Sequence, residues 1–390
     1  EKIARLRGYQ ADCITAMESN LMDGKRQILV AMATGTGKTF TTVASIYRML
    51  ESGLAKRILF LVDRKALAAQ AVREFAAFNT PQGNKFIQEY EVYSQRFQKD
   101  DFGDDDPFDP KLLPNGYLTD PKPGHSFVYV STIPRMAINL FGRQDAFAQS
   151  AGDPDMEDDA DRLDIPIHAF DLIIADECHR GYTARDISLW RDTIRHFDAM
   201  KVGLTATPAA HTVAVFGDPV YRYGVDQAVR DGFLVEHEAV KISSKVRMNG
   251  AFLKEGELVG KIDVATGAEV LDHLEDDRPF AAEQIERAIT VPDSNKKIIE
   301  EVAKYAYKHE AETGRFPKIL IFAVNDLPHV SHADQLVRIC REVFNQGDGF
   351  VQKITGSPSV DRPLQRIREF RNRPNPKVVV TVDMLSTGVD

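Results

Sequence analysis

The chain has 390 residues, a length that favours two or three domains over one ordinary core. With 43% hydrophobic and 27% charged residues it has a typical globular composition, and no apolar stretch is long enough for a membrane-spanning helix. The net charge of −9 argues against indiscriminate nucleic-acid binding, but acidic blocks at 100–109 and 153–164 supply much of it, which leaves room for a local basic groove. Three cysteines show no metal-binding spacing and fit reduced thiols in a cytoplasm: Cys13, Cys178 and Cys340.

The first predicted strand, residues 28–30, runs into the sequence AMATGTGKT at 31–39 and then into a predicted helix at 41–50. A buried strand, a glycine-containing turn and a helix in this order bind the phosphates of a nucleoside triphosphate through backbone N–H groups. We expect Lys38 to reach the β- and γ-phosphates and Thr39 to offer its hydroxyl to Mg²⁺. The cradle itself would consist of Thr34, Gly35, Thr36 and Gly37. Met32 replaces the first glycine of the strict pattern, so a glycine-rich turn that binds nothing is the alternative.

Further apolar runs at 58–63, 127–132, 172–176 and 202–205 predict a parallel sheet covered on both faces. The third of these runs ends in Asp176 and Glu177, two adjacent carboxylates. Asp176 is suited to hold Mg²⁺, and Glu177 to polarise an attacking water. The alternative is an acidic strand end that is merely solvated.

The second half of the chain begins with a mixed, glycine-spaced segment that we interpret as an inserted β-rich piece or linker. A second α/β unit follows, with a helix at 295–309 and strands at 318–323, 351–355 and 378–382. We therefore predict an α/β protein in three parts: 1–235, a linker at 236–290, and 291–390.

Several short sequences resemble the motifs of superfamily 2 helicases and translocases. TGTGKT at 34–39, DECH at 176–179 and TATP at 205–208 resemble motifs I, II and III. LRGYQ at 6–10 is similar to the adenine-reading segment, and DMLSTGVD at 383–390 to motif V. The resemblance implies a P-loop NTPase that uses ATP and Mg²⁺, with two RecA-like doubly wound domains, the second truncated. The finer resemblance is to the motor region of type I restriction enzyme R (HsdR) subunits.

That resemblance assigns roles to individual residues. Gln10 would hydrogen-bond the adenine edge, Arg7 would lie near the base, and Asp390 would complete the nucleotide contacts. His179, Thr205 and Thr207 would couple the nucleotide site to the second lobe. Contacts to double-stranded DNA are implied for Arg64, Lys65, Ser131, Thr132, Thr387 and Gly388. Any of these could instead be a helix cap or turn residue, Thr132 especially. For the helix at 65–78, packing is favoured over binding.

The family implies an ATP-dependent translocase that acts with specificity (S) and methyltransferase (M) subunits. Residues 1–390 contain neither a motif VI with its arginine finger nor a nuclease-like arrangement, so slow ATP hydrolysis and no DNA cleavage are expected of them. Two other hypotheses are left open. One is an RNA or DNA helicase of the same superfamily, and the other is a clamp that uses ATP only as a timer.

Overall fold

The computed structural model describes the chain outside residues 1–2, 4–5, 98–109, 144–159, 180–183, 241–250, 254–257, 263–268, 274–277, 281–288, 291, 327–330, 358 and 383–390. In the described part, the chain forms two compact units. Unit 1 ends at Glu236, and unit 2 begins at His237.

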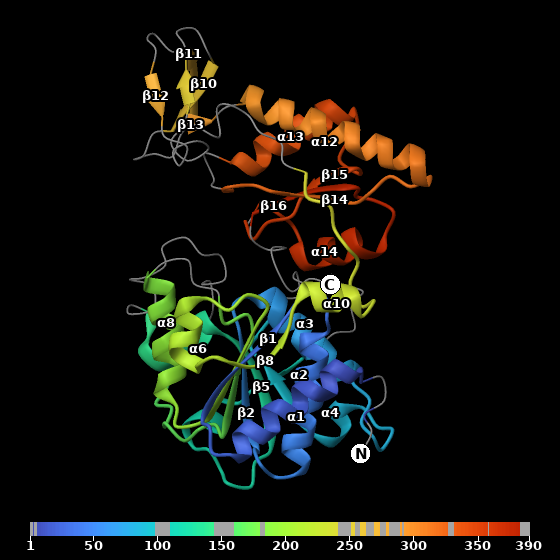
Figure 1. The fold of residues 1–390 in the computed structure, drawn as a ribbon. Helices are drawn as coiled ribbons and strands as arrows, with labels where there is room; N and C mark the ends of the chain where they lie inside the picture. The colour runs from blue at the N-terminus through green and yellow to red at the C-terminus, as the bar shows by residue number, and fades with distance from the viewer. Residues whose placement is uncertain are drawn as a thin grey trace. The chain divides into compact units, whose positions relative to one another are not determined.

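Unit 1 is built on an eight-stranded sheet in the order β4-β3-β5-β2-β6-β7-β1-β8 (Figure 1). All of its strand pairings are parallel. This confirms the predicted α/β class. The strands are β1 (Gln27–Met32), β2 (Arg57–Val62), β3 (Glu91–Ser94), β4 (Lys111–Leu112), β5 (Phe127–Thr132), β6 (Leu172–Ala175), β7 (Met200–Thr205) and β8 (Pro219–Tyr223).

Helices cover both faces of this sheet (Figure 1). Successive strand residues point to opposite faces, so Ile28 and Val30 of β1 join one core and Leu29 joins the other. One core lies under α1 (Gly8–Met22), α2 (Lys38–Glu51), α3 (Lys65–Ala77) and α4 (Phe86–Glu89). The other includes residues of α5 (Asn115–Thr119), α6 (Ile133–Phe141), α8 (Ala184–His196) and α9 (Ala210–Phe216). Trp190 is buried in the second core.

The carboxyl ends of the parallel strands meet at one edge of the sheet, where doubly wound folds bind their ligands. The phosphate-loop candidate follows β1, the paired acids follow β6, and Thr205 ends β7. These three strands are neighbours in the order β6-β7-β1. The topology thus brings the glycine loop to the same edge of the sheet as the acids and Thr205, which follow it in the chain by more than a hundred residues.

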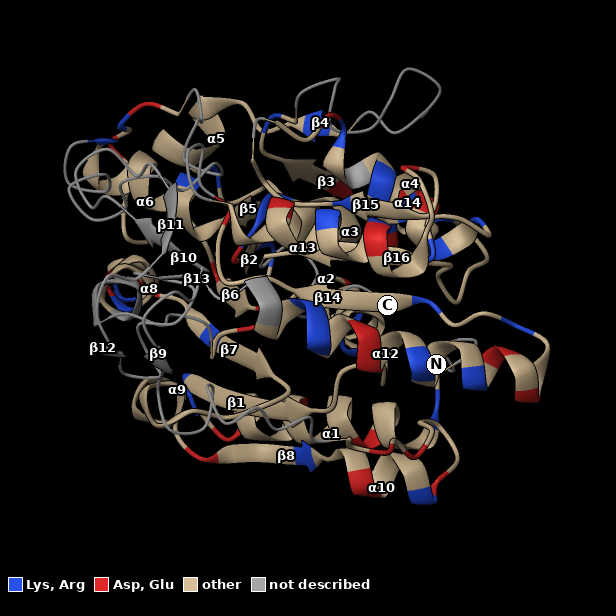
Figure 2. Cartoon of the chain, turned by 90° about the horizontal axis from the view of Figure 1, so that it is seen from above, with Lys and Arg blue, Asp and Glu red and all other residues tan. Residues whose placement is uncertain are grey.

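Unit 2 contains a smaller parallel sheet in the order β14-β16-β15. Its predicted strands are confirmed, as β14 (Ile319–Phe322), β15 (Val351–Lys353) and β16 (Val378–Thr381). The core contains residues of α12 (Pro292–Thr313) and α13 (His332–Phe344), and α14 (Pro363–Asn372) lies between β15 and β16 in the chain. Basic and acidic residues are interspersed along α12 (Figure 2). Such mixed charge is typical of a helix with one solvated face.

Five short strands lie between the two parallel sheets in sequence: β9 (Ala251–Leu253), β10 (Leu258–Ile262), β11 (Glu269–His273), β12 (Arg278–Phe280) and β13 (Ile289–Thr290). They pair antiparallel, in the orders β11-β10-β13 and β12-β9.

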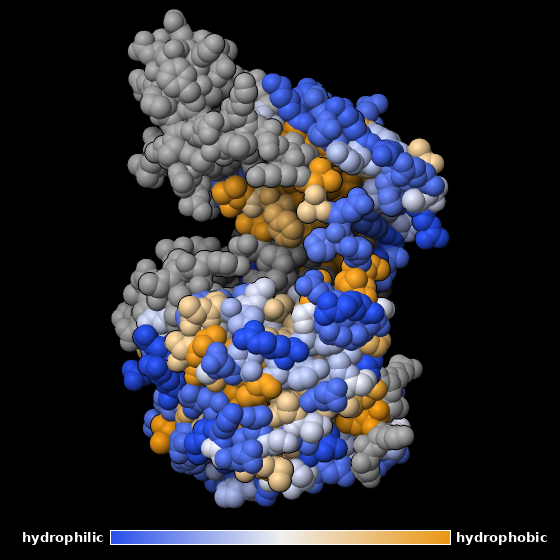
Figure 3. All heavy atoms as spheres, in the orientation of Figure 1, coloured by the Kyte–Doolittle hydropathy of each residue, from blue (hydrophilic) through white to orange (hydrophobic). Residues whose placement is uncertain are grey.

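The face of unit 1 seen in Figure 3 is largely hydrophilic, with small scattered hydrophobic areas. Within the described residues, no helix has the length and apolar character to cross a membrane.

Candidate active site

The loop between β1 and α2 has the conformation that its glycines permit. Gly35 and Gly37 have φ angles of 80° and 77°, in the left-handed region that side chains disfavour. A Cβ atom on Gly37 would lie 2.7 Å from Nε2 of Gln10. The Thr36 hydroxyl donates to the carbonyl oxygen of Ala33 over 2.6 Å and closes the turn. The first N–H groups of α2, which begins at Lys38, have no partner within their helix and suit an anion.

Lys38, Asp176 and Glu177 line one pocket. The Nζ atom of Lys38 lies 3.4 Å from Oε1 of Glu177, and both side chains are buried. The other residues of the pocket come from the glycine loop and from α3: Thr34, Gly35, Thr39, Leu67, Gln70 and Ala71. The structure thus brings together the three residues predicted to be catalytic and both predicted Mg²⁺ ligands. Their roles remain predictions.

Backbone contacts to two neighbouring strands fix the paired acids. The Asp176 N–H donates to the Leu61 carbonyl oxygen of β2 over 2.8 Å, and the Cys178 N–H to that of Leu204 on β7 over 3.1 Å. Between them, Glu177 has a φ of 50°, which is uncommon for a residue with a side chain. Its N–H donates to Oδ1 of Asp176. Residues held in such conformations cluster at functional sites, because the surrounding structure must enforce them.

Cys178 packs beneath this turn. A Cβ atom on Gly203 of β7 would lie 3.0 Å from the Cys178 sulfur and 2.9 Å from the Phe216 ring, so the glycine makes room for both side chains. Burial, together with the nearby carboxylates of Asp176 and Glu177, raises the pKa of the Cys178 thiol well above its usual value. The thiol therefore stays protonated and acts as a packing group.

His179 joins the acids to the end of β7. Its Nδ1 atom lies 2.8 Å from the Thr205 hydroxyl and 3.3 Å from Oε2 of Glu177. The Thr205 oxygen accepts the Thr207 N–H over 3.0 Å, so its own proton is available to a neutral His179. A protonated His179 would donate to Glu177 instead. His179 thus lies within contact distance of both Glu177 and Thr205, and the coupling role predicted for His179, Thr205 and Thr207 is untested.

The predicted adenine-reading residues lie against the phosphate loop. Gln10 accepts the Arg7 N–H at its Oε1 atom and donates from Nε2 to the Thr36 carbonyl oxygen over 3.2 Å. Tyr9, which the sequence did not single out, also donates to that oxygen, over 2.8 Å. Its ring stacks on Tyr223 of β8 at a centroid distance of 4.1 Å. Burial and a hydrogen bond to Asp231 raise the pKa of the Tyr223 hydroxyl to about 12.

The predicted DNA contacts have different surroundings. Arg64 is the N-cap residue of α3, with its guanidinium 3.2 Å from Asp63, and Lys65 is partly exposed. Ser131 and Thr132 are buried, and the Thr132 hydroxyl caps α6 by accepting the Arg135 N–H. The helix-cap alternative therefore applies to Thr132. Thr387, Gly388 and Asp390, with the whole of motif V, lie outside the described residues.

Gln70 was missed by the sequence analysis, which assigned its helix to packing. Leu67, Val72 and Phe75 of α3 do pack as predicted. Leu67, Gln70 and Ala71, however, recur at the spacing of one helical face and line the phosphate pocket. Within the part of the chain that the structure describes, the Gln70 amide makes no hydrogen bond. The helical spacing in the sequence places Leu67, Gln70 and Ala71 on one face of α3, but it does not show that this face lines a pocket.

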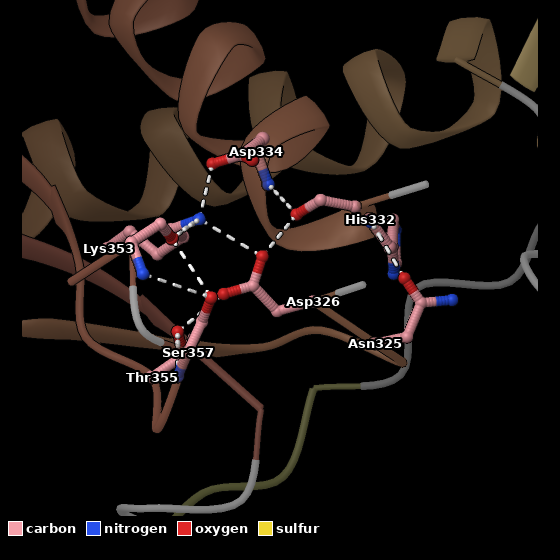
Figure 4. A network of polar contacts seen from close by, with 9 residues as sticks. Asn325, Asp326, His332, Asp334, Lys353, Thr355 and Ser357 are labelled. Atoms are coloured by element: carbon pink, nitrogen blue, oxygen red, sulfur yellow. Dashed lines mark hydrogen bonds and ion pairs between the residues drawn. The ribbon is translucent and has the colours of Figure 1, made fainter. Parts of the chain in front are cut away.

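Unit 2 has a polar network at the carboxyl ends of β14 and β15 (Figure 4). The Asp326 carboxylate accepts from Ser331 over 2.6 Å, from Lys353 over 3.0 Å and from the Thr355 hydroxyl. Lys353 also lies 2.8 Å from Asp334. Burial alone would raise the pKa of Asp326, but the hydrogen bonds from Ser331, Thr355 and Lys353 outweigh it and lower the pKa. The network ties the segment after β15 to the segment after β14.

Comparisons with known proteins place the chain among restriction enzymes. The family model described as type III restriction enzyme, res subunit, matches residues 3–210. The type I restriction enzyme EcoKI endonuclease subunit of Escherichia coli (strain K12) is 34% identical over 99% of the chain and 30% of that protein. The EcoAI endonuclease subunit of Escherichia coli is 29% identical over 98% of the chain and 40% of that protein. The chain thus spans less than half the length of either relative.

Two solved structures share the fold over the whole chain. A fragment described as an HsdR subunit of a type I restriction enzyme from Vibrio vulnificus YJ016 matches with a TM-score of 0.54 at 19% identity, over 56% of that fragment. The ATP-dependent type ISP restriction-modification enzyme LlaBIII, bound to DNA, matches with a TM-score of 0.55 at 14% identity, over 25% of its chain. At these identities the likeness is one of fold alone.

Proposed function

Because the chain belongs to the family described as type III restriction enzyme, res subunit, we propose that it is an ATP-hydrolysing motor that moves double-stranded DNA. We assign this motor to a type I restriction system, in which the chain is the motor region of the R subunit. The two type I endonuclease subunits matched over nearly the whole chain confirm the resemblance that the motifs predicted.

The observation that carries the proposal is the meeting of Lys38, Asp176 and Glu177 in one pocket beside a glycine loop. Lys38 binds the β- and γ-phosphates, and the N–H groups of the loop from Thr34 to Thr39 surround them. Glu177 orients the attacking water and accepts its proton. This division of roles needs an ammonium group and a carboxylate at the γ-phosphate, and both line the pocket.

Mg²⁺ fits the donor set of the pocket. The Thr39 hydroxyl and the Asp176 carboxylate line it together, and such hard oxygen atoms are the ligands that this ion prefers. These two residues would hold the ion, which supplies positive charge against the phosphate oxygens. Arg7 and Gln10 bind the adenine, since they lie beside the loop at Thr36 and Gly37.

We assign residues 1–235 to a first RecA-like domain, 236–290 to a β-rich linker and 291–390 to a second RecA-like domain. His179, Thr205 and Thr207 carry the state of the γ-phosphate away from Glu177, along the hydrogen bonds at the end of β7. Arg64, Lys65, Thr387 and Gly388 are assigned to the phosphates of the DNA, which position the duplex without reading its sequence. Ser131 and Thr132 are left out of this assignment, because both are buried and the Thr132 hydroxyl caps α6. Asp390 is assigned to the nucleotide.

The partners of this motor are the S and M subunits of a type I complex, since a translocase that contacts only phosphates needs another protein to select its site. Its place of action is the cytoplasm, where ATP, Mg²⁺ and DNA occur together.

The test is displacement of a third strand from a triplex by the full-length R subunit assembled with its S and M subunits. We expect duplex DNA to stimulate ATP hydrolysis and the third strand to be released only with ATP and Mg²⁺. Lys38→Ala abolishes both activities, whereas Lys25→Ala, at an exposed lysine outside the pocket, changes neither. Duplex-stimulated hydrolysis without displacement would identify a timed clamp, and stimulation by RNA alone an RNA helicase.

A further inference from the structure

The segment that follows α10 (Val225–Arg230) folds back toward the phosphate loop. Gly232 has a φ of 75°, and the N–H groups of Phe233 and Leu234 both donate to the Ala228 carbonyl oxygen. This turn places the Leu234 side chain 3.1 Å from the position of a Cβ atom on Gly35. The turn after α10 is therefore part of the surroundings of the loop.

Phe233 lies beside both residues that flank the predicted adenine site. Its ring centroid is 5.0 Å from that of Tyr9, and the guanidinium carbon of Arg7 lies 4.6 Å from the Phe233 centroid. Tyr9 in turn stacks on Tyr223. Despite these contacts, Phe233 is 39% exposed. An aromatic ring that is held by its neighbours and is still exposed to this extent is suited to receive a flat ligand.

We propose that Phe233, held beside the stacked pair of Tyr9 and Tyr223 and against the Arg7 guanidinium, is a base-binding residue that stacks on the purine ring of ATP. The inference rests on the proposed function, because it adds a specificity residue to the same nucleotide site. Gln10 offers an amide to the polar edge of a base, but the faces of the base need an aromatic ring or a guanidinium group. Stacking of one base on an aromatic side chain is worth about five- to 150-fold in affinity.

The position of Phe233 gives this contact a consequence beyond affinity. Unit 1 ends at Glu236, so the residue that stacks on the base belongs to the segment by which the chain leaves the unit. Binding of the base therefore immobilises the start of the connection to unit 2. A polyphosphate without a base lacks this effect, since it reaches only the loop and the acids.

The experiment compares ligands with and without a base. Equilibrium binding of a non-hydrolysable ATP analogue, the matching CTP analogue and inorganic tripolyphosphate is measured on the full-length R subunit with Mg²⁺, for wild type, three Phe233 variants and one control variant. Phe233→Ala and Phe233→Leu weaken the ATP analogue at least fivefold and leave tripolyphosphate within twofold. Phe233→Tyr keeps the affinity for the ATP analogue. Since Leu preserves an apolar side chain against Tyr9, it separates loss of stacking from loss of packing.

Val235→Ala is the matched control, because Val235 is 87% exposed and belongs to the same segment. It leaves all three affinities unchanged. Equal weakening of the ATP analogue and tripolyphosphate in Phe233→Ala, or unchanged affinity for the ATP analogue, overturns the inference while the nucleotide site stands. A wild-type protein that binds neither the ATP analogue nor tripolyphosphate overturns the proposed function itself.

Discussion

Lys38 and Glu177 form a buried ion pair across the phosphate pocket, with 3.4 Å between Nζ and Oε1. Each charge offsets part of the cost of keeping the other away from water. Under the proposed function, the phosphates of a nucleotide would compete with Glu177 for the same ammonium group. We therefore expect nucleotide binding to release the Glu177 carboxylate from Lys38 at the moment when a water molecule must be activated.

Glu177→Gln separates these two events. The amide cannot accept a proton from water, so we expect the rate of ATP hydrolysis to fall at least a hundredfold. Binding persists, or tightens slightly, because Lys38 no longer has a competing carboxylate. Phosphate release under saturating ATP gives the rate, and titration with a fluorescent nucleotide gives the affinity.

Glu51→Gln is the control for this change, since Glu51 is exposed at the end of α2, away from the glycine loop. It should hydrolyse ATP like the wild type. Normal hydrolysis by Glu177→Gln would show that another group activates the water, and lost binding would show that the pocket has collapsed.

Gln70 is expected to contact the bound phosphates or the attacking water, because its amide lines the pocket. Gln70→Leu retains most of the volume and removes every hydrogen bond. We expect kcat for ATP hydrolysis to fall about tenfold, the cost of about 1.4 kcal/mol that one hydrogen bond in such a site typically contributes. Steady-state kinetics at varied ATP concentration measure kcat and KM separately.

Gln27→Leu makes the same chemical change at the other end of β1, where the side chain is exposed. Its kinetics should match the wild type. If Gln70→Leu also matched the wild type, Gln70 would be a bystander in the pocket.

The parts of the site that the sequence predicted are those in which a local pattern has one physical use. The glycine loop with Lys38 and the acids at 176–177 are short, continuous motifs at strand ends, and parallel strands bring such ends together. The central strands of the large sheet and all three strands of the small parallel sheet were likewise predictable, because continuous apolar runs between polar segments are typical of a sheet buried on both faces. The sequence analysis did not predict β3, β4 and β8, which lie at the two ends of the strand order.

The residues that were missed depend on distant contacts. Phe233 is a single aromatic residue in a loop, and only the fold shows that it lies beside Arg7. Gln70 has a helical position that fits packing equally well. At Thr132 the sequence suggested two roles, because a hydroxyl at a strand end can contact a phosphate or cap a helix. The structure shows that the Thr132 hydroxyl caps α6.

Acid should destabilise unit 2 through Asp326. Its pKa is lowered in the folded state, so the carboxylate contributes stability above its unfolded pKa of about 4 and loses it as the pH falls through the folded value. Asp326→Asn should lower stability near pH 7 by about 1–3 kcal/mol, since it removes one of the two carboxylates that contact Lys353. Thermal unfolding between pH 3 and pH 7 measures both effects. The loss of stability below pH 4 should be smaller in the variant than in the wild type.

Asp348→Asn provides the comparison, because the side chain of Asp348 is 86% exposed in its ion pair with Arg341. It should follow the wild-type pH profile. Identical profiles for Asp326→Asn and the wild type would mean that Asp326 does not govern the acid sensitivity of this unit.

Gly203→Ala should destabilise unit 1, although the change adds one methyl group. The new Cβ atom would lie 2.9 Å from the Phe216 ring and 3.0 Å from the Cys178 sulfur, and β7 is held in register by β1 and β6 on either side. Phe216 must therefore move, and overpacking of this kind costs about 1–3 kcal/mol. Urea denaturation followed by circular dichroism measures the loss.

The double variant Gly203→Ala/Phe216→Leu should recover part of the lost stability, because the smaller leucine side chain leaves room for the new methyl group. Gly116→Ala is the control, and it should leave stability nearly unchanged because Gly116 in α5 has open surroundings. Additive losses in the double variant would place the strain somewhere other than the contact between residues 203 and 216.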